Sequence, residues 1–347
     1  VTQRVLIAAD KFKGSLTAPQ VAERVTAGLR RVVPDVEVEA LPVADGGDGT
    51  VDAAVAAGFE RREARVAGPL GHEVTAAFAL RGETAVVEMA EASGLQRLPA
   101  GVFAPLSAST YGSGELLRAA LDAGARTIVF GVGGSATTDG GAGMLSALGA
   151  RFLDADGEPV PPGGGGLAEL ARADLSDLDP RLASVELILA SDVDNPLTGP
   201  KGAPAVYGPQ KGASPDDVEI LDAALAHYAK ALEEAAGPEA AEYAASPGAG
   251  AAGGIGYGAL LLGADRILRS LPAVVDEPDD IEARTALLEG AALAGRALEN
   301  ASMGVHHGLA QLLGARAGIS HGLANSLLLP HAMRFNAEVA PAEMARL

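Results

Sequence analysis

Short apolar runs and amphipathic stretches alternate along the greater part of this chain. Residues 5–9 form a continuous apolar run, which is typical of a buried parallel strand. Within 18–33 an apolar residue recurs at about every fourth position, which predicts a helix lying on a sheet, with Thr17 as its N-cap. A strand is expected at 36–41. Strand, loop, helix and strand in this order indicate an open α/β fold.

The alternation continues with two changes of pattern. Three strand-like pieces, separated by Gly-Pro and Arg-Gly turns, predict antiparallel pairing and the entry into a second domain. Strands and helices then alternate again, and from residue 279 onward the pattern is entirely helical. The expected strands of this part are 64–67, 74–80, 84–89, 127–130 and 185–190, and the expected helices are 51–57, 114–123, one from Ala142, 215–235 and one after Gly254.

Composition narrows the class of protein. The 347 residues carry 26 Lys and Arg against 45 Asp and Glu, a formal net charge of −19, and no cysteine. Such a field repels phosphate backbones and anionic lipids, so neither nucleic acid nor a membrane is expected as a partner. The lack of cysteine excludes disulfides, thiolate metal sites and a cysteine nucleophile. No apolar run approaches the ~20 residues of a membrane span and no signal-peptide pattern is present, so a cytoplasmic protein is expected.

A glycine-rich loop is expected at 131–141, between the strand 127–130 and the helix that begins at Ala142. The backbone N–H groups of such a loop and the helix N-terminus can hold phosphate oxygens without a basic side chain. The loop has neither the Gly-Lys-Ser/Thr of a Walker loop nor the G-x-G-x-x-G spacing. A phosphate-binding loop is the preferred interpretation, and a purely structural turn is the alternative.

Two pairs of aspartates, Asp45 with Asp48 and Asp192 with Asp194, stand in loops next to expected elements. Two close carboxylates can bind Mg²⁺ through oxygen, or one can take a proton from a hydroxyl group while the other raises its pKa. A solvated Asp-Gly turn is the alternative that the residues leave open.

The lysines are few, and their positions are unusual. Of five lysines in the chain, four lie in Gly- or Pro-rich loops beside these motifs, at Lys11, Lys13, Lys201 and Lys211. Lysines that serve solubility are expected on helix faces instead. Lys11 and Lys211 are therefore expected to contact phosphate.

Six segments occur in an order that is similar to the bacterial glycerate kinase family. They are ADKFKGSL (9–16), ADGGDGT (44–50), GVGGSATTDGG (131–141), SDVDNPLTGP (191–200), GPQKG (208–212) and PGAGAAGG (247–254). The resemblance covers about residues 1–262 and implies ATP-dependent phosphorylation of D-glycerate with Mg²⁺. It also implies a two-domain fold, with the active site in the cleft between the domains.

The resemblance and the change of pattern together predict the organisation of the chain. The expected fold class is α/β, with two α/β domains, one inserted in the other, and an all-helical C-terminal segment. The expected parts are 1–65 (N-terminal part of the first domain), 66–245 (inserted domain), 246–266 (return to the first domain) and 267–347 (helical segment).

Phosphoryl transfer depends on positioning and on neutralising charge, which gives the candidate residues their expected roles. Asp192 is expected to bind the Mg²⁺ that bridges the β and γ phosphates. Asp45 or Asp48 is expected to accept the proton of the reacting hydroxyl group. Lys11 or Lys211 is expected to offset negative charge. The other residues expected to bind substrate or nucleotide are Lys13, Ser15, Gly46, Gly47, Gly133, Gly134, Ser135, Thr137, Asp139, Asn195 and Gln210.

The part of the chain from about residue 267 onward resembles a different family, the helical domain of iron-containing alcohol dehydrogenases and maleylacetate reductases. The resemblance rests on 300–314 and 321–331, and it implies metal binding by His307 and His321. That family completes its site with an Asp and a His spaced i, i+4, a pair that this chain lacks. Two imidazoles alone hold a divalent metal weakly, so a structural role of both histidines is preferred.

Three functions stay open. The first is a glycerate kinase, active or impaired by its atypical C-terminus. The second is a metal- and NAD-dependent alcohol dehydrogenase-like protein, and the third is an inactive chimera. ADP release with D-glycerate distinguishes the first from the third, whereas NADH oxidation with bound iron or zinc favours the second. The residues also leave open which hydroxyl group of glycerate reacts and whether the chain forms a homodimer.

Overall fold

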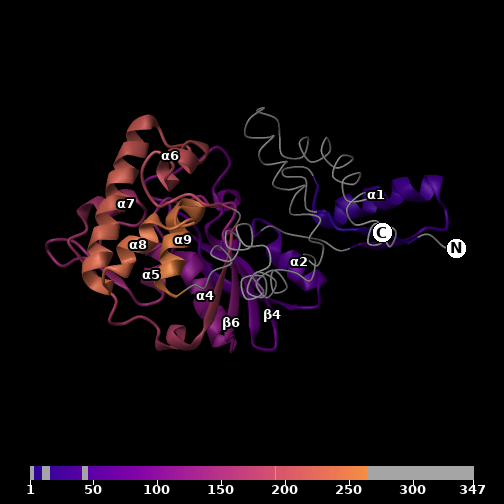
Figure 1. Cartoon of the computed structure of the whole chain (residues 1–347), viewed down its shortest axis with the longest axis horizontal. Coiled ribbons are helices and arrows are strands. Elements are labelled where there is room, and N and C mark those ends of the chain that lie inside the picture. Colours follow the sequence, from indigo (N-terminus) through magenta and orange to yellow (C-terminus); the bar gives the residue numbers. More distant parts are fainter. Residues whose placement is uncertain (1–3, 10–15, 41–45, 192, 264–347) are drawn as a thin grey trace, which may run out of the picture. The chain divides into compact units, whose positions relative to one another are not determined.

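The computed structural model describes residues 4–9, 16–40, 46–191 and 193–263, and the chain divides into two compact units (Figure 1). The first unit comprises 1–43 and 295–347, and the second comprises 44–294. The helical segment predicted at 267–347 lies outside the described residues.

The first unit contains the expected strand, helix and strand. Strand β1 (Arg4–Ile7) pairs in parallel with β2 (Glu37–Ala40), and helix α1 (Ala18–Val32) connects them. Thr17 caps α1 as predicted, because its side chain accepts a hydrogen bond from the backbone N–H of Gln20. The Gln20 side chain accepts one from the Thr17 N–H in return, which completes a capping box.

The second unit is built on a mixed five-stranded sheet in the order β3-β4-β5-β6-β9. Its strands are β3 (Glu60–Ala67), β4 (Glu73–Arg81), β5 (Thr84–Glu88), β6 (Thr127–Gly131) and β9 (Glu186–Ala190). The pairs β3–β4 and β4–β5 are antiparallel, which confirms the prediction for this part of the chain. The pairs β5–β6 and β6–β9 are parallel, so the carboxyl ends of three strands meet at one edge.

Both faces of the central strands of this sheet are buried, which explains why these strands read as continuous apolar runs. Helix α2 (Thr50–Ala56) covers one face, where Val51 packs with Val129 of β6. Helix α4 (Tyr111–Asp122) lies on the opposite face, where Leu117 belongs to the same cluster as Phe130. Because successive side chains of a strand point to opposite faces, neighbouring residues of β6 enter the two different clusters.

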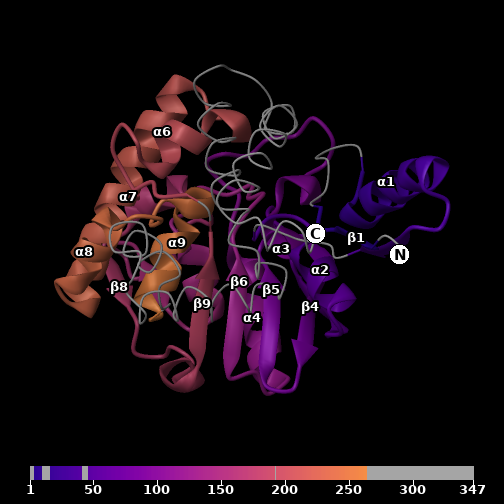
Figure 2. The same cartoon turned by 45° about the vertical axis from the view of Figure 1, so that its right-hand side comes forward.

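Further helices gather beyond β9 and enlarge the core on the α4 face (Figure 2). They include α5 (Ala142–Ala147), α7 (Pro215–Ala236) and α9 (Ala251–Leu261). The ring of Tyr228 on α7 meets the ring of Tyr257 on α9 edge to face, with centroids 5.9 Å apart. The remaining short elements are α3 (Ala90–Ser93), α6 (Ala203–Tyr207), α8 (Glu239–Ala245), β7 (Arg151–Leu153), β8 (Arg172–Asp174) and 3₁₀ turns at Leu95–Arg97, Gly165–Glu169, Pro180–Ser184 and Pro209–Lys211.

The observed division of the chain differs from the expected one at two points. The first boundary falls between residues 43 and 44, whereas 65 was expected, because α2 packs on the sheet of the second unit. Residues 246–263 also belong to the second unit, because α9 buries Ile255 and Tyr257 in the same core as β6 and α7. The expected return to the first domain at 246–266 therefore does not appear in the described residues.

Helix α7 confirms the helix expected at 215–235 and begins with a capping box between Ser214 and Asp217.

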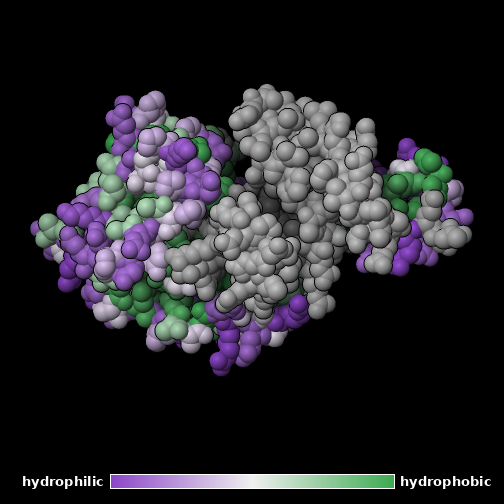
Figure 3. Space-filling model, viewed as in Figure 1, coloured by the Kyte–Doolittle hydropathy of each residue, from purple (hydrophilic) through white to green (hydrophobic). Residues whose placement is uncertain are grey.

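Hydrophilic residues spread over the visible surface around α6 and α7 (Figure 3). Among the helices in the described ranges, none has the length and apolar character needed to cross a bilayer.

Helix α9 opens with a left-handed turn. Ala252, Gly253 and Gly254 have φ angles of 53°, 76° and 94°, and Ala252 is the one residue other than glycine with a positive φ in the described part of the chain. A residue with a Cβ atom is strained in this conformation by about 1–2 kcal/mol.

Replacing Ala252 by glycine relieves this strain, although glycine also gains freedom in the unfolded chain. The net expectation for Ala252→Gly is a free energy of unfolding that rises by about 0.5–1 kcal/mol, measured by urea denaturation. Ala251→Gly is the matched control. Ala251 is buried without a positive φ, so its substitution is expected to lower stability by at least ~0.5 kcal/mol. A lower free energy of unfolding in Ala252→Gly than in the wild type would contradict backbone strain at Ala252.

Candidate active site

The carboxyl ends of β5, β6 and β9 form an edge at which ligands bind in open α/β sheets. Loop 131–141 follows β6, and the segment 191–200 follows β9. Loop 46–49, which precedes α2, packs against the ends of both strands. Three of the motifs found in the sequence therefore meet at this edge.

Backbone atoms, rather than side chains, make the contact between loop 46–49 and the strand ends. The N–H of Gly133 donates a hydrogen bond of 3.0 Å to the carbonyl of Gly46. A Cβ atom at Gly46 would lie 2.5 Å from the Ala190 carbonyl oxygen, and one at Gly131 would lie 2.6 Å from the Gly46 oxygen. At Gly133 a Cβ atom would overlap Gly47. Glycine is thus required where these segments approach each other.

The close approach buries one carboxylate oxygen of Asp48. This atom, Oδ1, has no hydrogen-bond partner among the described residues. It faces Gly134, where an added Cβ atom would overlap it. A buried carboxylate oxygen is costly unless a hydrogen-bond donor or a cation satisfies it. Among the described aspartates, Asp48 is thus the one with a buried side-chain oxygen that lacks a hydrogen-bond partner.

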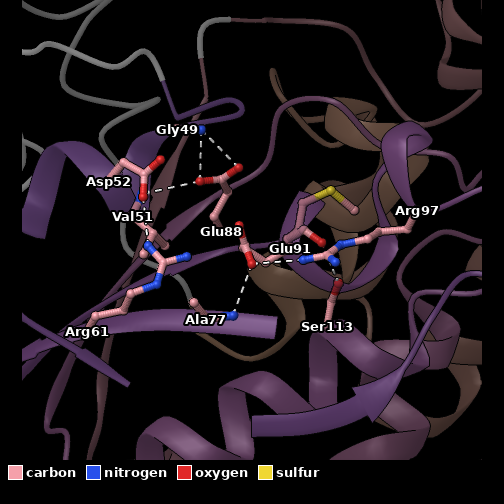
Figure 4. A network of polar contacts seen from close by, with 10 residues as sticks. Gly49, Val51, Asp52, Arg61, Ala77, Glu88, Glu91, Arg97 and Ser113 are labelled. Carbon is pink, nitrogen blue, oxygen red and sulfur yellow. Dashed lines mark hydrogen bonds and ion pairs between the residues drawn. The ribbon is translucent and has the colours of Figure 1, made fainter. Parts of the chain in front are cut away.

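Glu88 ends β5 directly below this loop and is only 1 % exposed. Its carboxylate accepts hydrogen bonds from the N–H of Gly49, 3.1 Å from each oxygen, and from the N–H of Val51 at 3.2 Å (Figure 4). Burial, together with the nearby charges of Glu91 and Asp48, raises the pKa of Glu88 to about 7, against the effect of these hydrogen bonds. Sequence reasoning missed Glu88, although a charged residue at the end of an apolar strand is a usable signal.

Lys211 is also buried, with 1 % of its surface exposed, and its side chain contacts loop 131–141. Its ammonium donates hydrogen bonds to Ser135 Oγ at 2.6 Å and to the carbonyl of Thr137 at 2.5 Å. Burial lowers the pKa of Lys211 to about 7, although the charge of Asp139 acts in the opposite direction. The lysine thus fixes the positions of two residues that were predicted to bind nucleotide or substrate.

Asp139 holds the far end of the same loop. It is fully buried and accepts hydrogen bonds from the Thr110 N–H and hydroxyl at 2.8 and 2.9 Å, from the Gly141 N–H at 3.2 Å and from the Gly143 N–H at 3.3 Å. Burial raises the pKa of this carboxyl, and the four hydrogen bonds oppose the increase. Its contacts in this structure are therefore with the backbone and with Thr110.

The left-handed turn at the start of α9 also contacts loop 131–141. The N–H of Gly140 donates to the carbonyl of Gly253 at 3.1 Å. A Cβ atom at Gly253 would overlap the Thr137 carbonyl and would lie 2.8 Å from Lys211 Nζ. The motif 247–254 therefore packs on loop 131–141 and on the buried lysine, as neighbouring parts of one site.

Two further predicted residues, Asn195 and Gln210, lie in the described part of the chain. The Asn195 side chain donates to the Lys201 carbonyl at 2.8 Å and accepts a hydrogen bond of 2.5 Å from the Tyr207 hydroxyl. Gln210 is exposed. Other predicted site residues lie outside the described residues, namely Lys11, Lys13, Ser15, Asp45, Asp192, His307 and His321.

In the second unit, glycine-rich loops converge at the carboxyl ends of parallel strands, around buried acidic and basic side chains. This arrangement is typical of ligand-binding enzymes of the open α/β class. Residues 5–295 match the model of the glycerate kinase family, and the chain belongs to that family. This match extends past residue 262, where the resemblance was expected to end. Residues 261–347 match the C-terminal part of the Fe-containing alcohol dehydrogenase family. Both resemblances found in the sequence are thereby confirmed.

Curated relatives are similar over most of the chain. Glycerate kinase of Halalkalibacterium halodurans is 52 % identical over 257 residues, which are 73 % of this chain and 67 % of that protein. Glycerate kinase of Bacillus subtilis is 49 % identical over 279 residues, covering 80 % and 72 %. Glycerate 2-kinase of Escherichia coli is 48 % identical over 257 residues, covering 73 % and 66 %.

A solved structure supports the fold. The crystal structure of a candidate glycerate kinase 2 from Salmonella typhimurium LT2 superposes with a TM-score of 0.68 at 46 % sequence identity. The similarity covers 76 % of this chain and 71 % of that chain. The mixed α/β architecture described above is therefore shared with that structure.

The buried Lys211 makes stability depend on pH. The unfolded chain keeps this proton up to its ordinary pKa of 10.5, whereas the folded chain releases it near 7. Stability therefore rises with pH between these values, by about 1.4 kcal/mol per pH unit at most. We expect Lys211→Met to lose this rise, measured by urea denaturation at about pH 7 and about pH 9. Lys230→Met, which removes an exposed lysine of α7, is the control and should keep it. Parallel profiles for wild type and Lys211→Met would contradict a neutral buried lysine.

Proposed function

We propose that this chain transfers the γ-phosphoryl group of ATP to a hydroxyl group of D-glycerate. Membership of the glycerate kinase family and the names of the curated relatives support this activity. The observation that carries the proposal is the convergence of loops 46–49 and 131–141 at one strand edge, around a carboxylate oxygen of Asp48. Kinase chemistry needs a proton acceptor next to an anion-binding loop, and the contact between these two loops supports such an arrangement.

Asp48, or Asp45 in the same motif, accepts the proton of the reacting hydroxyl group in this proposal. The hydroxyl oxygen forms a bond to the γ-phosphorus, and the bond from that phosphorus to the β–γ bridging oxygen breaks. ADP leaves with the electron pair of the broken bond. The unpartnered oxygen of Asp48 supports this role, because a carboxylate already occupied by internal donors is a weaker proton acceptor.

Loop 131–141 holds the phosphates through its backbone. Gly134 places its N–H group near the end of β6 without a side chain that would cover it, whereas the Gly133 N–H already donates to the Gly46 carbonyl, and Ser135 and Thr137 follow. Lys211 holds the loop through its hydrogen bonds to Ser135 and Thr137, and its side chain, when protonated, adds positive charge there. Backbone binding explains how a chain with a net charge of −19 accepts two anionic substrates.

Mg²⁺ enters this reaction as part of the MgATP substrate and offsets charge on the phosphates. Asp192 remains its proposed ligand, because Mg²⁺ prefers carboxylate oxygen and because this residue comes shortly after β9 in the sequence. Lys11, Lys13 and Ser15 keep their proposed roles toward glycerate and phosphate. For Asp139 and Asn195, which were expected to bind substrate or nucleotide, the proposed role is instead to hold the neighbouring loops in place.

The acceptor is proposed to be the 2-hydroxyl group. The Escherichia coli relative, 48 % identical, is named glycerate 2-kinase, which favours this position over the 3-hydroxyl. The cytoplasm, where ATP is available, is the proposed location. A homodimer remains a hypothesis that this mechanism does not require.

A second candidate function follows from the match of residues 261–347 to the alcohol dehydrogenase family. A metal- and NAD-dependent dehydrogenase-like activity would place metal on His307 and His321. Oxidation of NADH by the protein, with stoichiometric iron or zinc retained after gel filtration, would support it. A protein with neither activity would be the inactive chimera.

The first test is ADP release by the full chain with MgATP, with and without D-glycerate. We expect glycerate-dependent release in the range of about 1–100 turnovers per second, as for other kinases. Enolase converts 2-phosphoglycerate directly, so coupling the product to enolase alone identifies the reacting hydroxyl group. ADP release that is the same with and without D-glycerate would overturn the proposal.

The roles of the aspartates are tested by substitution. Asp45→Asn, Asp48→Asn and Asp192→Asn are each expected to lower kcat at least ~10²-fold, because they remove a proton acceptor or a metal ligand. Asp52→Asn is the matched control, because Asp52 lies three residues beyond the loop, on α2, where it pairs with Arg61 at the surface. Near wild-type kinetics in all three variants would refute the assignment.

A further inference from the structure

Glu88 holds the backbone on the C-terminal side of Asp48. Its oxygens accept hydrogen bonds from the N–H of Gly49, the residue that follows Asp48, and from the N–H of Val51 (Figure 4). These N–H groups belong to the beginning of α2, where the helix itself provides no acceptor. The peptide that joins Asp48 to the next residue is therefore fixed by a carboxylate at the end of β5.

The other side of Asp48 is fixed by different contacts. The carbonyl of Gly46 accepts from the N–H of Gly133 at 3.0 Å, and the carbonyl of Gly47 accepts from the Thr50 hydroxyl at 2.6 Å. Asp48 stands between these two sets of anchors, while its own Oδ1 has no partner among the described residues. The position of that oxygen thus depends on how firmly the flanking backbone is held.

A buried carboxylate is an expensive way to satisfy two N–H groups. Burying a charged group costs several kcal/mol unless it is paired, whereas a Ser or Asn side chain caps a helix at much lower cost. Glu88 is 1 % exposed and has no cationic partner among the described residues. Its two oxygens do, however, reach both Gly49 and Val51 at once, which a shorter side chain at the end of β5 cannot do.

We propose that Glu88 is a positioning residue for phosphoryl transfer, which holds Asp48 at the reacting hydroxyl group by fixing the peptide that follows it. This inference rests on the proposed function of Asp48. Glu88 itself contacts backbone groups and acts on the reaction only through the position of that side chain. Misplacing a reacting group by about 1 Å can cost about 100-fold in rate, so loss of the hydrogen bonds between Glu88 and this backbone is expected to lower the rate.

The same strand end offers a matched control in Glu91. This carboxylate lies one helical turn further on and accepts from the Ala77 N–H at 3.0 Å and from Arg97 at 2.9 Å (Figure 4). Its side chain is 18 % exposed, so it is largely buried like Glu88. Its hydrogen bonds lead away from loop 46–49. Loss of Glu91 therefore disturbs the same region without releasing the backbone next to Asp48.

The test compares Glu88→Gln, Glu88→Ala and Glu91→Gln in the full chain, with steady-state kinetics for ATP and D-glycerate. Glutamine keeps one acceptor oxygen and alanine keeps none, so kcat is expected to fall about 10-fold in Glu88→Gln and about 100-fold in Glu88→Ala. The KM for ATP should stay within about twofold, because loop 131–141 remains intact. Glu91→Gln should keep kcat within about twofold of wild type.

Hydrogen exchange of the amides in 46–51 gives a second readout that does not need activity. Exchange is expected to accelerate in both Glu88 variants and to stay unchanged in Glu91→Gln. Equal kcat losses at Glu88 and Glu91, or unchanged exchange in Glu88→Ala, would overturn the inference. A wild-type protein without glycerate-dependent ADP release would instead remove the proposed function, and the exchange result would still decide whether Glu88 holds the loop.

Discussion

Backbone-to-backbone packing of glycines at the carboxyl edge of the sheet is the constraint on which the site depends. Gly46 lies against the Ala190 carbonyl, and Gly131 and Gly133 lie against Gly46 and Gly47, with no room for a Cβ atom. This contact brings loop 46–49 to the ends of β6 and β9. One carboxylate oxygen of Asp48 in this loop is buried as a result, and buried polar atoms must be satisfied by the chain or by a ligand.

Buried ionisable groups stabilise the loops around this contact, and burial shifts their pKa values in opposite directions. The pKa of Glu88, at the end of β5, is raised to about 7. The pKa of Lys211, which contacts loop 131–141, is lowered to about 7. Burial disfavours the charged form of both groups, although they have opposite charges. The site therefore achieves rigidity at a cost in stability, as expected where loops must hold a fixed geometry for chemistry.

The chain combines similarity to two families, and its described part belongs to the first. The glycerate kinase match runs to residue 295, and the alcohol dehydrogenase match begins at residue 261. Loops 46–49 and 131–141, Lys211 and the turn 252–254 lie in one compact unit, which comprises residues 44–294. The expected proton acceptor Asp45 and the expected Mg²⁺ ligand Asp192 belong to the same motifs in sequence as the described Gly46 and Asn195.

Local pattern determined most of the fold, because periodicity and end signals act within a few residues. The capped helix after Thr17, the antiparallel run of β3 to β5 and the glycine-rich loop after β6 could all be predicted from neighbouring residues. Packing between distant segments decided the rest. Glu88 is marked in sequence only by a charge at the end of an apolar strand, and its contact with Gly49 spans 39 positions. Lys211, which was expected to contact phosphate, donates a hydrogen bond to Ser135, 76 positions away. Such contacts depend on which loops the sheet brings together, and no local periodicity contains that information.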